Sequence, residues 1–305
     1  MHRYKAFGLN IDSEIVLPEL SEGDPQSEVD LTIKKGEVIL PETAPTRIFR
    51  RSTEAHFGQD IENNLYLTWN NIASFKAISG DILIVSPQNP DHSIISLFTV
   101  SEALGLILFQ RGYFLLHASS VLVGDEAWCF MGEPGAGKST TAAAFIKAGC
   151  KLLSDDLTAI RMDQNGVAHV IPAYPQLKIW ENTVNGLAYD QTTLQPVSEG
   201  VRKFAYHPTS TFSHGAVKLG KVFFLHKTGD IQSPQPLLAG DIPTQLLIHF
   251  PLPTALLVGE ALKRHFMQSM QCGKSAEMWR MKRPEGFANL ESWVSECISK
   301  SVINE

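Results

Sequence analysis

Over residues 1–90, hydrophobic and polar positions alternate in short runs that clusters of Gly and Pro separate. The runs 31–40, 65–69 and 82–85 are rich in β-branched and aromatic residues, which favour strands. No catalytic motif occurs within this part of the chain. We therefore expect residues 1–90 to form a smaller, β-rich N-terminal domain that serves either for substrate docking or for structural support.

The pattern changes at Asp91, after which apolar residues recur at helical spacing as far as Gly112. Short apolar strands follow on either side of a turn at Gly124-Asp125, and a buried strand over 127–131 leads into a glycine-rich stretch. Strands and helices are then expected in alternation at 222–225, 242–250, 262–272, 278–281 and 290–298. Such alternation predicts that residues 91–305 form an α/β domain with a central mixed sheet.

Composition narrows the class of protein. Hydrophobic residues make up 44% and charged residues 19% of the 305 residues, which is typical of a folded globular chain. The formal net charge of -6 and the lack of a long basic run argue against nucleic acid as a partner. The apolar segment 104–116 is interrupted by polar residues, so we expect no membrane span. The four cysteines have no CxxC or zinc spacing and fit a reducing cytoplasm.

A phosphate-binding motif follows the buried strand. Residues 132–139 match the pattern G-x-x-x-x-G-K-[ST] without a gap, and a helical run begins at Thr140. In this P-loop pattern, backbone N–H groups and the start of the helix bind phosphate oxygens. Lys138 is expected to reach the β and γ phosphates, and Ser139 to offer a hydroxyl to Mg²⁺. The predicted nucleotide-binding residues are Gly132, Glu133, Pro134, Gly135, Ala136, Gly137, Lys138, Ser139 and Thr140.

Two adjacent acids, Asp155 and Asp156, end the short apolar strand after this helix. A right-handed crossover would make that strand parallel to the strand before the loop, so that both end at the same edge of the sheet. We therefore expect both carboxylates near the γ-phosphate. One could bind Mg²⁺, and the other could accept the proton of an attacking hydroxyl. The alternative is a solvated Asp-Asp turn.

The stretch 115–160, LLHASSVLVGDEAWCFMGEPGAGKSTTAAAFIKAGCKLLSDDLTAI, resembles the catalytic core of the bacterial HPr kinase/phosphorylase family. The order is the same: a His-containing strand, a hairpin, the P-loop, a short helix and an Asp-Asp strand end. The resemblance implies ATP or another nucleoside triphosphate as phosphoryl donor, Mg²⁺ as cofactor, a kinase reaction and a homo-oligomer. It also implies roles for single residues: Asp155 as general base, Ser139 and Asp156 on the metal side, His117 near the reacting centre, and Arg202 and Lys203 near the phosphates.

The chain departs from the family in two places. The glycine-rich signature that follows the Asp-Asp strand in HPr kinases is replaced here by residues 172–180, PAYPQLKIW, so HPr is not the expected substrate. The opening YKAFGLNIDSEIVLPEL looks like the branch of the family found with ribosomal-peptide biosynthesis, some members of which phosphorylate a serine of a lasso-peptide precursor. This similarity implies a serine hydroxyl in a protein or peptide as the phosphoryl acceptor.

Two other functions are also compatible with the sequence. A small-molecule kinase, for example one acting on free serine, would use the same loop, but it would not need a docking domain. A nucleotide-dependent sensor would bind ATP without transfer, although two retained acids argue against it. The histidines at 226, 249 and 265 are too far apart in the sequence to suggest a metal site.

Overall fold

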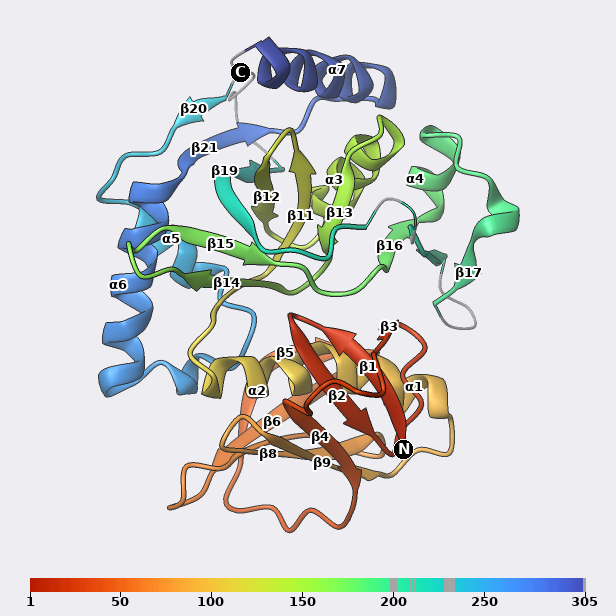
Figure 1. Ribbon diagram of the computed structural model, residues 1–305, viewed down its shortest axis with the longest axis vertical. Helices are drawn as coiled ribbons and strands as arrows, with labels where there is room; N and C mark the ends of the chain where they lie inside the picture. Colours follow the sequence, from red (N-terminus) through yellow and green to blue (C-terminus); the bar gives the residue numbers. More distant parts are fainter. Residues whose placement is uncertain (198–201, 209, 211, 228–233, 304–305) are drawn as a thin grey trace. The chain divides into compact units, whose positions relative to one another are not determined.

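The computed structural model describes residues 1–197, 202–208, 210, 212–227 and 234–303. The chain divides into two compact units. Unit 1 comprises Met1–Leu115 and Phe250–His265, and unit 2 comprises Leu116–His249 and Phe266–Glu305. The mixed α/β class expected from the sequence is confirmed, since both units contain a large mixed sheet (Figure 1).

Unit 1 is built on a nine-stranded sheet in the order β3-β1-β2-β4-β9-β8-β7-β6-β5. Its pairs are antiparallel except for β2 with β4 and β4 with β9, which are parallel. The strands are β1 (His2–Ala6), β2 (Leu9–Ser13), β3 (Ser21–Glu22), β4 (Leu31–Lys35), β5 (Ala44–Arg50), β6 (Thr53–Gln59), β7 (Leu65–Trp69), β8 (Ala73–Ile78) and β9 (Ile82–Pro87). The short helix η4 (Thr254–Leu256) also belongs to this unit.

The helical segment that begins after Asp91 belongs to unit 1, so the compact units divide after Leu115 rather than near residue 90. It consists of α1 (His92–Phe98), the π-helical turn η1 (Thr99–Ala103) and α2 (Leu104–Gln110). The Asp91 carboxylate caps α1 by accepting from the Ser93 backbone N–H. The segment stays with the sheet because Phe98 packs edge-on against Trp69, with ring centroids 5.0 Å apart.

The stretch His92–Gln110 is also the part of the described chain that is long and apolar enough to cross a membrane by length and composition. Its mean hydropathy is 1.7, and 67% of it is buried inside the structure. Burial of this kind is typical of a core helix, in agreement with its place against the sheet of unit 1.

Unit 2 carries a second large sheet, whose strands follow the order β14-β15-β19-β12-β11-β13, with β21 beside β19. A small sheet in the order β16-β18-β17 stands apart from it. The strands are β11 (Ala118–Val123), β12 (Glu126–Gly132), β13 (Lys151–Ser154), β14 (Thr158–Met162), β15 (Ala168–Ile171), β16 (Leu177–Trp180), β17 (Gln195–Pro196), β18 (Lys203–Tyr206), β19 (Val217–His226), β20 (Gln235–Pro236) and β21 (Glu277–Lys282). Strand β10 (Phe114–Leu116) lies where the two units divide.

The helices of unit 2 include α3, which lies between the glycine-rich loop and β13. They are α3 (Lys138–Lys147), α4 (Glu181–Gly186), the short η2 (Gln191–Thr193), α5 (Ile242–Ile248) and α7 (Phe287–Ile303). Helix α6 (Gly259–Ser275) contributes to both units. The fully buried Phe145 anchors α3 by packing against Trp128, Phe130 and Trp293, at ring-centroid distances of 5.8, 5.3 and 5.7 Å. This aromatic contact fixes the helix that begins at the loop.

Strand directions bring several strand ends to one edge of the unit 2 sheet. Strand β12 is parallel to β19, and β19 is parallel to β21. Strand β13 runs in the same direction as β12, as expected from the sequence, although β11 lies between them and is antiparallel to both. The carboxyl ends of β12, β13, β19 and β21 therefore point the same way, and the residues that follow these strands share one edge.

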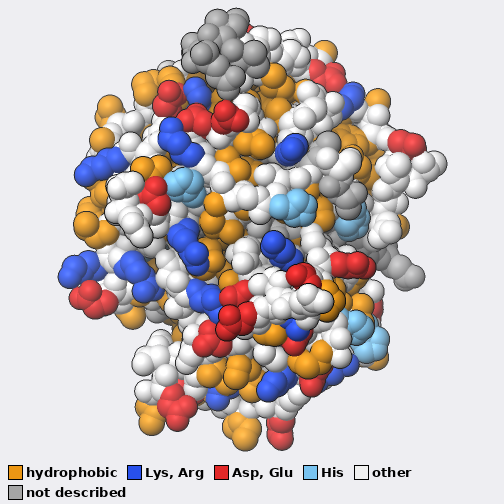
Figure 2. Space-filling model, in the orientation of Figure 1, with side chains coloured by type: hydrophobic (Ala, Val, Ile, Leu, Met, Phe, Trp, Pro, Cys, Tyr) orange, Lys and Arg blue, Asp and Glu red, His pale blue; other side chains and the backbone are white. Residues whose placement is uncertain are grey.

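Figure 2 shows Lys and Arg side chains interspersed with Asp and Glu over the face that it displays. The charges on this face are mixed rather than gathered into one extended basic patch. This mixture is in keeping with the modest formal net charge of -6.

Candidate active site

The glycine-rich loop connects the end of β12 to the start of α3. Gly137 is the N-cap residue of α3 and has a φ of 98°, a left-handed conformation that favours glycine. No side chain caps the helix. The first backbone N–H groups of α3 are therefore left for a ligand, as in an anion-binding helix start.

Lys138 is almost completely buried beside this loop, with 8% of its surface exposed. Its Nζ donates to the Gly132 carbonyl oxygen at 2.9 Å, so the ammonium folds back over the loop. Burial lowers the pKa of Lys138; Asp156 and Asp155 oppose this shift, and the cations of Lys203 and Lys227 add to it. A cation held in this way is available to a phosphate bound in the loop.

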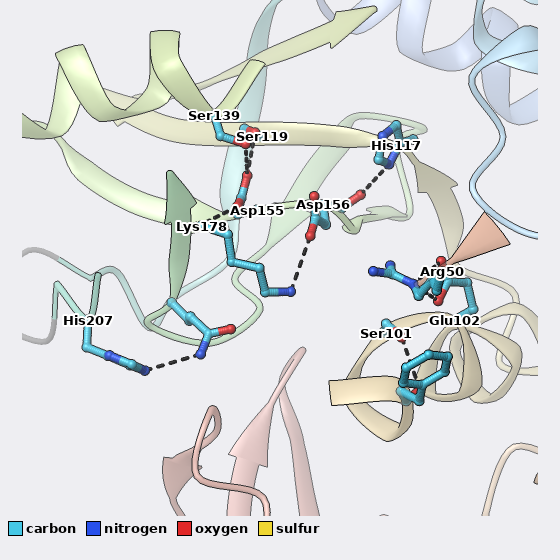
Figure 3. Close-up of polar contacts among 12 residues, drawn as sticks. Arg50, Ser101, Glu102, His117, Ser119, Ser139, Asp155, Asp156, Lys178 and His207 are labelled. Atoms are coloured by element: carbon cyan, nitrogen blue, oxygen red, sulfur yellow. Dashed lines mark hydrogen bonds and ion pairs between the residues drawn. The ribbon is translucent and has the colours of Figure 1, made fainter. Parts of the chain in front are cut away.

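Asp155 lies next to the first turn of α3 and is 5% exposed. Its Oδ1 accepts hydrogen bonds from Ser119 Oγ at 2.6 Å and from Ser139 Oγ at 2.9 Å, and its Oδ2 accepts from the Lys178 backbone N–H at 2.9 Å (Figure 3). Burial raises the pKa of Asp155, and the neighbouring Asp156 carboxylate raises it further. Asp155 is therefore fixed by three donors from three different segments.

Asp156 differs from its neighbour in backbone and in surroundings. Its φ of 66° is left-handed, which turns the chain at the end of β13. Its Oδ2 forms an ion pair with the Lys178 Nζ at 3.2 Å, and its side chain is 22% exposed. His117 Nδ1 donates to the Asp156 carbonyl oxygen at 3.0 Å, since a carbonyl can only accept (Figure 3). In the neutral His117 ring, the lone pair then lies on Nε2.

Several of these groups line a cavity of about 660 Å³ in unit 2. Ten of the residues predicted from the sequence line it: His117, Pro134, Gly135, Gly137, Lys138, Ser139, Thr140, Asp156, Arg202 and Lys203. Four predicted residues do not line it, namely Gly132, Glu133, Ala136 and Asp155. The structure thus brings the loop and Asp156 to one cavity and places Asp155 behind Ser139.

Arg202 and Lys203 reach the cavity from the small sheet, where β18 pairs with β16. Arg202 is loosely held, because its guanidinium is 84% exposed and lies 3.4 Å from Glu181. The Lys203 ammonium lies over the Trp180 ring, 5.6 Å from its centroid. Both cations line the cavity, but neither contacts the loop in the hydrogen-bond network of the described residues.

Several residues in the cavity or next to it were not predicted from the sequence. No role was predicted for Lys178, a charged residue within an apolar strand, or for Ser119, which lies in the stretch 115–160 that carries the family resemblance. Thr183 bonds Thr140 through its hydroxyl at 2.9 Å. Arg283 lines the cavity from the segment after β21. Arg283 directly follows a strand that runs parallel to β19 toward the same edge, a pairing that becomes visible only in the structure.

A larger cavity of about 770 Å³ lies at the other end of β12, beside Glu126 and Trp128. Trp279 and Trp293 also line it, yet it contains none of the loop residues and neither of the paired acids. Its size alone therefore does not make it the reacting centre. The smaller cavity is the candidate active site because the glycine-rich loop and the Asp156 carboxylate converge there.

The candidate site has the groups that a nucleoside triphosphate and Mg²⁺ require. Oxyanions would meet the N–H groups at the start of α3 and the Lys138 ammonium. The hydroxyl of Ser139 and the carboxylate of Asp156 are hard oxygen ligands of the kind that Mg²⁺ prefers. Among the described residues, no group of three or more His, Cys, Asp and Glu forms a metal cage. A metal ion here would share its coordination with phosphate oxygens and water.

Comparison with known proteins gives limited information. No family model matches the chain, and no curated protein matches it. Among solved structures, the HPr(Ser) kinase/phosphatase from Coxiella burnetii is similar, with 17% sequence identity and a TM-score of 0.28. The match covers 41% of this chain and 64% of that structure. This similarity is weak, and the function is therefore inferred from the geometry of the site.

Proposed function

We propose that this protein is a kinase that transfers the γ-phosphoryl group of ATP, with Mg²⁺, to the hydroxyl of a serine in a protein or peptide. One observation supports this most strongly. The loop residues Lys138 and Ser139 line the same cavity as the Asp156 carboxylate, and Ser139 is hydrogen-bonded to Asp155. Phosphoryl transfer requires mainly positioning and charge stabilisation, and this arrangement can supply both.

Asp155 suits the role of a positioning residue for Ser139. A serine hydroxyl that donates its hydrogen to Asp155 Oδ1 keeps its oxygen lone pairs for a cation. When bound, Mg²⁺ would neutralise negative charge on the phosphate oxygens. Ser139 and Asp156 would hold the ion, because both oxygen groups line the cavity. Asp155 would act on the ion through Ser139.

The role of general base, which the family resemblance implies for Asp155, is less well supported by the geometry. A base has to come within hydrogen-bond distance of the attacking hydroxyl. Asp155 does not line the cavity, and its two oxygens already accept from three donors. A loose transition state needs little proton removal early in the reaction, so positioning can supply most of the catalysis. We therefore propose that orienting Ser139 is the main task of Asp155.

The peptide acceptor is proposed from the sequence resemblance, with the precursor of a ribosomally made lasso peptide as the specific candidate. We propose that residues 1–90, with their nine strands, dock such a peptide. An extended peptide can add to the edge of a sheet, and β3 and β5 are the edge strands of unit 1. A free amino acid would not need such a surface.

An acceptor panel tests this function. The purified full-length chain is incubated with Mg²⁺ and γ-labelled ATP beside serine-containing peptides, alanine-substituted peptides, free serine or buffer alone. We expect label on serine peptides and none on their alanine counterparts. Label on free serine alone would indicate the small-molecule kinase. Nucleotide binding without transfer to any acceptor would indicate the sensor, and would contradict the proposed kinase.

A further inference from the structure

Arg283 follows β21 at the edge where the glycine-rich loop lies. The register of the strands shows this directly: Gly132 at the end of β12 pairs with Leu225 of β19, and His226 of β19 pairs with Lys282 of β21. The register of the parallel strands therefore places Arg283 next to the start of α3. Neither the loop motif nor the paired acids point to this residue in the sequence.

The Arg283 side chain lies directly against Gly137. A Cβ atom added at Gly137 would come 2.7 Å from Arg283 Cδ and 2.8 Å from Arg283 Nε. Arg283 also lines the cavity that contains Lys138 and Ser139. Its guanidinium therefore sits beside the N-terminal end of α3, on the side from which a phosphate would be bound.

The guanidinium is incompletely satisfied. Its Nη1 is buried and has no hydrogen-bond partner within the described part of the chain, and no carboxylate there lies within ion-pair distance. The acid nearest in sequence, Glu285, pairs with Lys282 instead, with Nζ and Oε1 2.6 Å apart. Burial also lowers the pKa of Arg283, since it disfavours the charged guanidinium. The residue as a whole is half-buried, but a buried guanidinium N–H without an acceptor is costly, and native proteins rarely keep one without a use.

Other cations surround the same loop. The Lys227 ammonium lies beside Gly135, where an added Cβ atom would be 3.3 Å from its Nζ. Lys203 and Lys227 both lower the pKa of Lys138. Together with Arg283, these groups concentrate positive charge around the loop, while Lys178 has its own partner in Asp156. The charge that would balance this cluster is that of a polyanion.

We infer that Arg283 is a phosphate-binding residue of this site, with its guanidinium donating to oxygens of the phosphate chain held by the loop. The inference rests on the proposed function, because it assumes that a triphosphate binds there. Arginine suits this task because its planar fork can donate two parallel hydrogen bonds to one phosphate. Arg283 is half-buried, in contrast to the largely exposed Arg202, and would thus make the better-ordered contact.

Calorimetry of the full-length chain tests this inference with two probes, MgATP and inorganic tripolyphosphate, the second of which has no base or sugar. Arg283→Met keeps much of the side-chain volume and removes the charge. We expect it to weaken binding of both probes about 10- to 100-fold, the loss typical of a charge-assisted contact. The matched control is Arg280→Met on β21, three residues before Arg283. The Arg280 guanidinium is exposed and donates to Gln235, and we expect the affinities of this variant to match the wild type.

Thermal unfolding without ligand separates a binding role from a structural one. Removing a half-buried charge that has no anionic partner among the described residues should leave the melting temperature of Arg283→Met unchanged or raised. If this variant does not fold, Arg283→Lys keeps the charge but loses the fork, and we expect it to bind both probes several-fold more weakly. Wild-type binding of both probes by a folded variant would overturn the inference alone. No binding of either probe by the wild-type chain would overturn the proposed function as well.

Discussion

The Oγ of Ser139 donates a 2.9 Å hydrogen bond to Oδ1 of Asp155. This contact joins the last residue of the loop motif to the first of the paired acids, although the two residues are 16 positions apart in the chain. It also distinguishes the surroundings of the two acids. Asp155 is turned toward the protein and Asp156 toward the cavity, so substitutions at the two positions should have different structural consequences.

The two acids can be compared through Asn substitutions. In Asp155→Asn, one of the two carboxylate oxygens becomes an NH₂ group, which can only donate. The side chain can then no longer accept from both the Ser139 hydroxyl and the Lys178 backbone N–H. We expect a higher Mg²⁺ requirement, with the rate partly restored by excess Mg²⁺. Asp156→Asn should also raise the requirement, and Asn tolerates the left-handed backbone at this position. Initial rates measured over a range of Mg²⁺ concentrations check both expectations.

A different result would restore the base role of Asp155. General-base catalysis typically contributes roughly 10²–10⁴-fold to the rate. If Asp155→Asn lost that much in kcat, kept its ATP affinity and could not be rescued by Mg²⁺, Asp155 would be the proton acceptor. If both variants kept rates within about twofold of the wild type, the acids would have no part in the reaction.

Two glycines flank α3 and form a matched pair. Gly137 and Gly149 have nearly the same φ, 98° and 97°, so an alanine at either position is strained in its backbone. Only at Gly137 would the new Cβ meet a neighbour, Arg283, whereas nothing lies within 4 Å at Gly149. We expect both variants to lose on the order of 1 kcal/mol of stability. Only Gly137→Ala should also lose ATP affinity, as measured by calorimetry beside thermal unfolding.

If the two variants bound ATP equally well, the closeness of Arg283 to the loop would have no functional importance. Equal loss of affinity in both would mean that backbone strain in α3, and not the contact at Gly137, weakens binding.

Much of the secondary structure followed from the sequence because local signals were strong. The helical repeat after Asp91 and the hairpin at Gly124-Asp125 are both present, and Val123 pairs with Glu126 across that turn. The division of the chain could not be predicted in the same way. Phe98 packs on Trp69, and a contact between residues so far apart in sequence leaves no local pattern.

The arrangement of the candidate site followed from the sequence where one continuous segment contains its residues. Residues 132–139 form a local motif, and the direction of β13 followed from the short crossover. The contacts of Lys178 and Arg283 depend on strand order and register, which the sequence pattern did not reveal. The burial of Asp155 likewise depends on Ser119 from a neighbouring strand. For this reason the sequence could place both acids near the loop but could not distinguish their surroundings.

A buried histidine in unit 1 predicts how stability changes with pH. Burial lowers the pKa of His265 from 6.5 to about 4. The unfolded chain then binds more protons between these values, so the free energy of unfolding falls as the pH drops from 6.5 toward 4. His265 Nε2 has no hydrogen-bond partner among the residues that the structure describes, and its ring packs against Phe114 and Phe250. We expect His265→Phe to be accommodated and to reduce this loss of stability.

Urea unfolding at pH 7 and at pH 4.5 measures the effect. Burial also lowers the pKa of His249 to about 4, so some pH dependence should persist in His265→Phe. His92→Gln is the control, because His92 is exposed. We expect this variant to lose as much stability between the two pH values as the wild type. If wild type and His265→Phe lost the same stability between the two pH values, His265 would not be buried in its neutral form.

The most direct test of the account is phosphoryl transfer by Lys138→Ala and Lys147→Ala beside the wild type. Both lysines lie on α3, but Lys138 lines the cavity, whereas Lys147 is exposed and pairs with Glu291. Transfer of label from γ-labelled ATP to a serine peptide should be Mg²⁺-dependent in the wild type and in Lys147→Ala. Lys138→Ala should lose transfer and about 1.5–3 kcal/mol of ATP binding while remaining folded. Unchanged transfer and ATP affinity in Lys138→Ala would contradict the account, because the loop would then not be the nucleotide site.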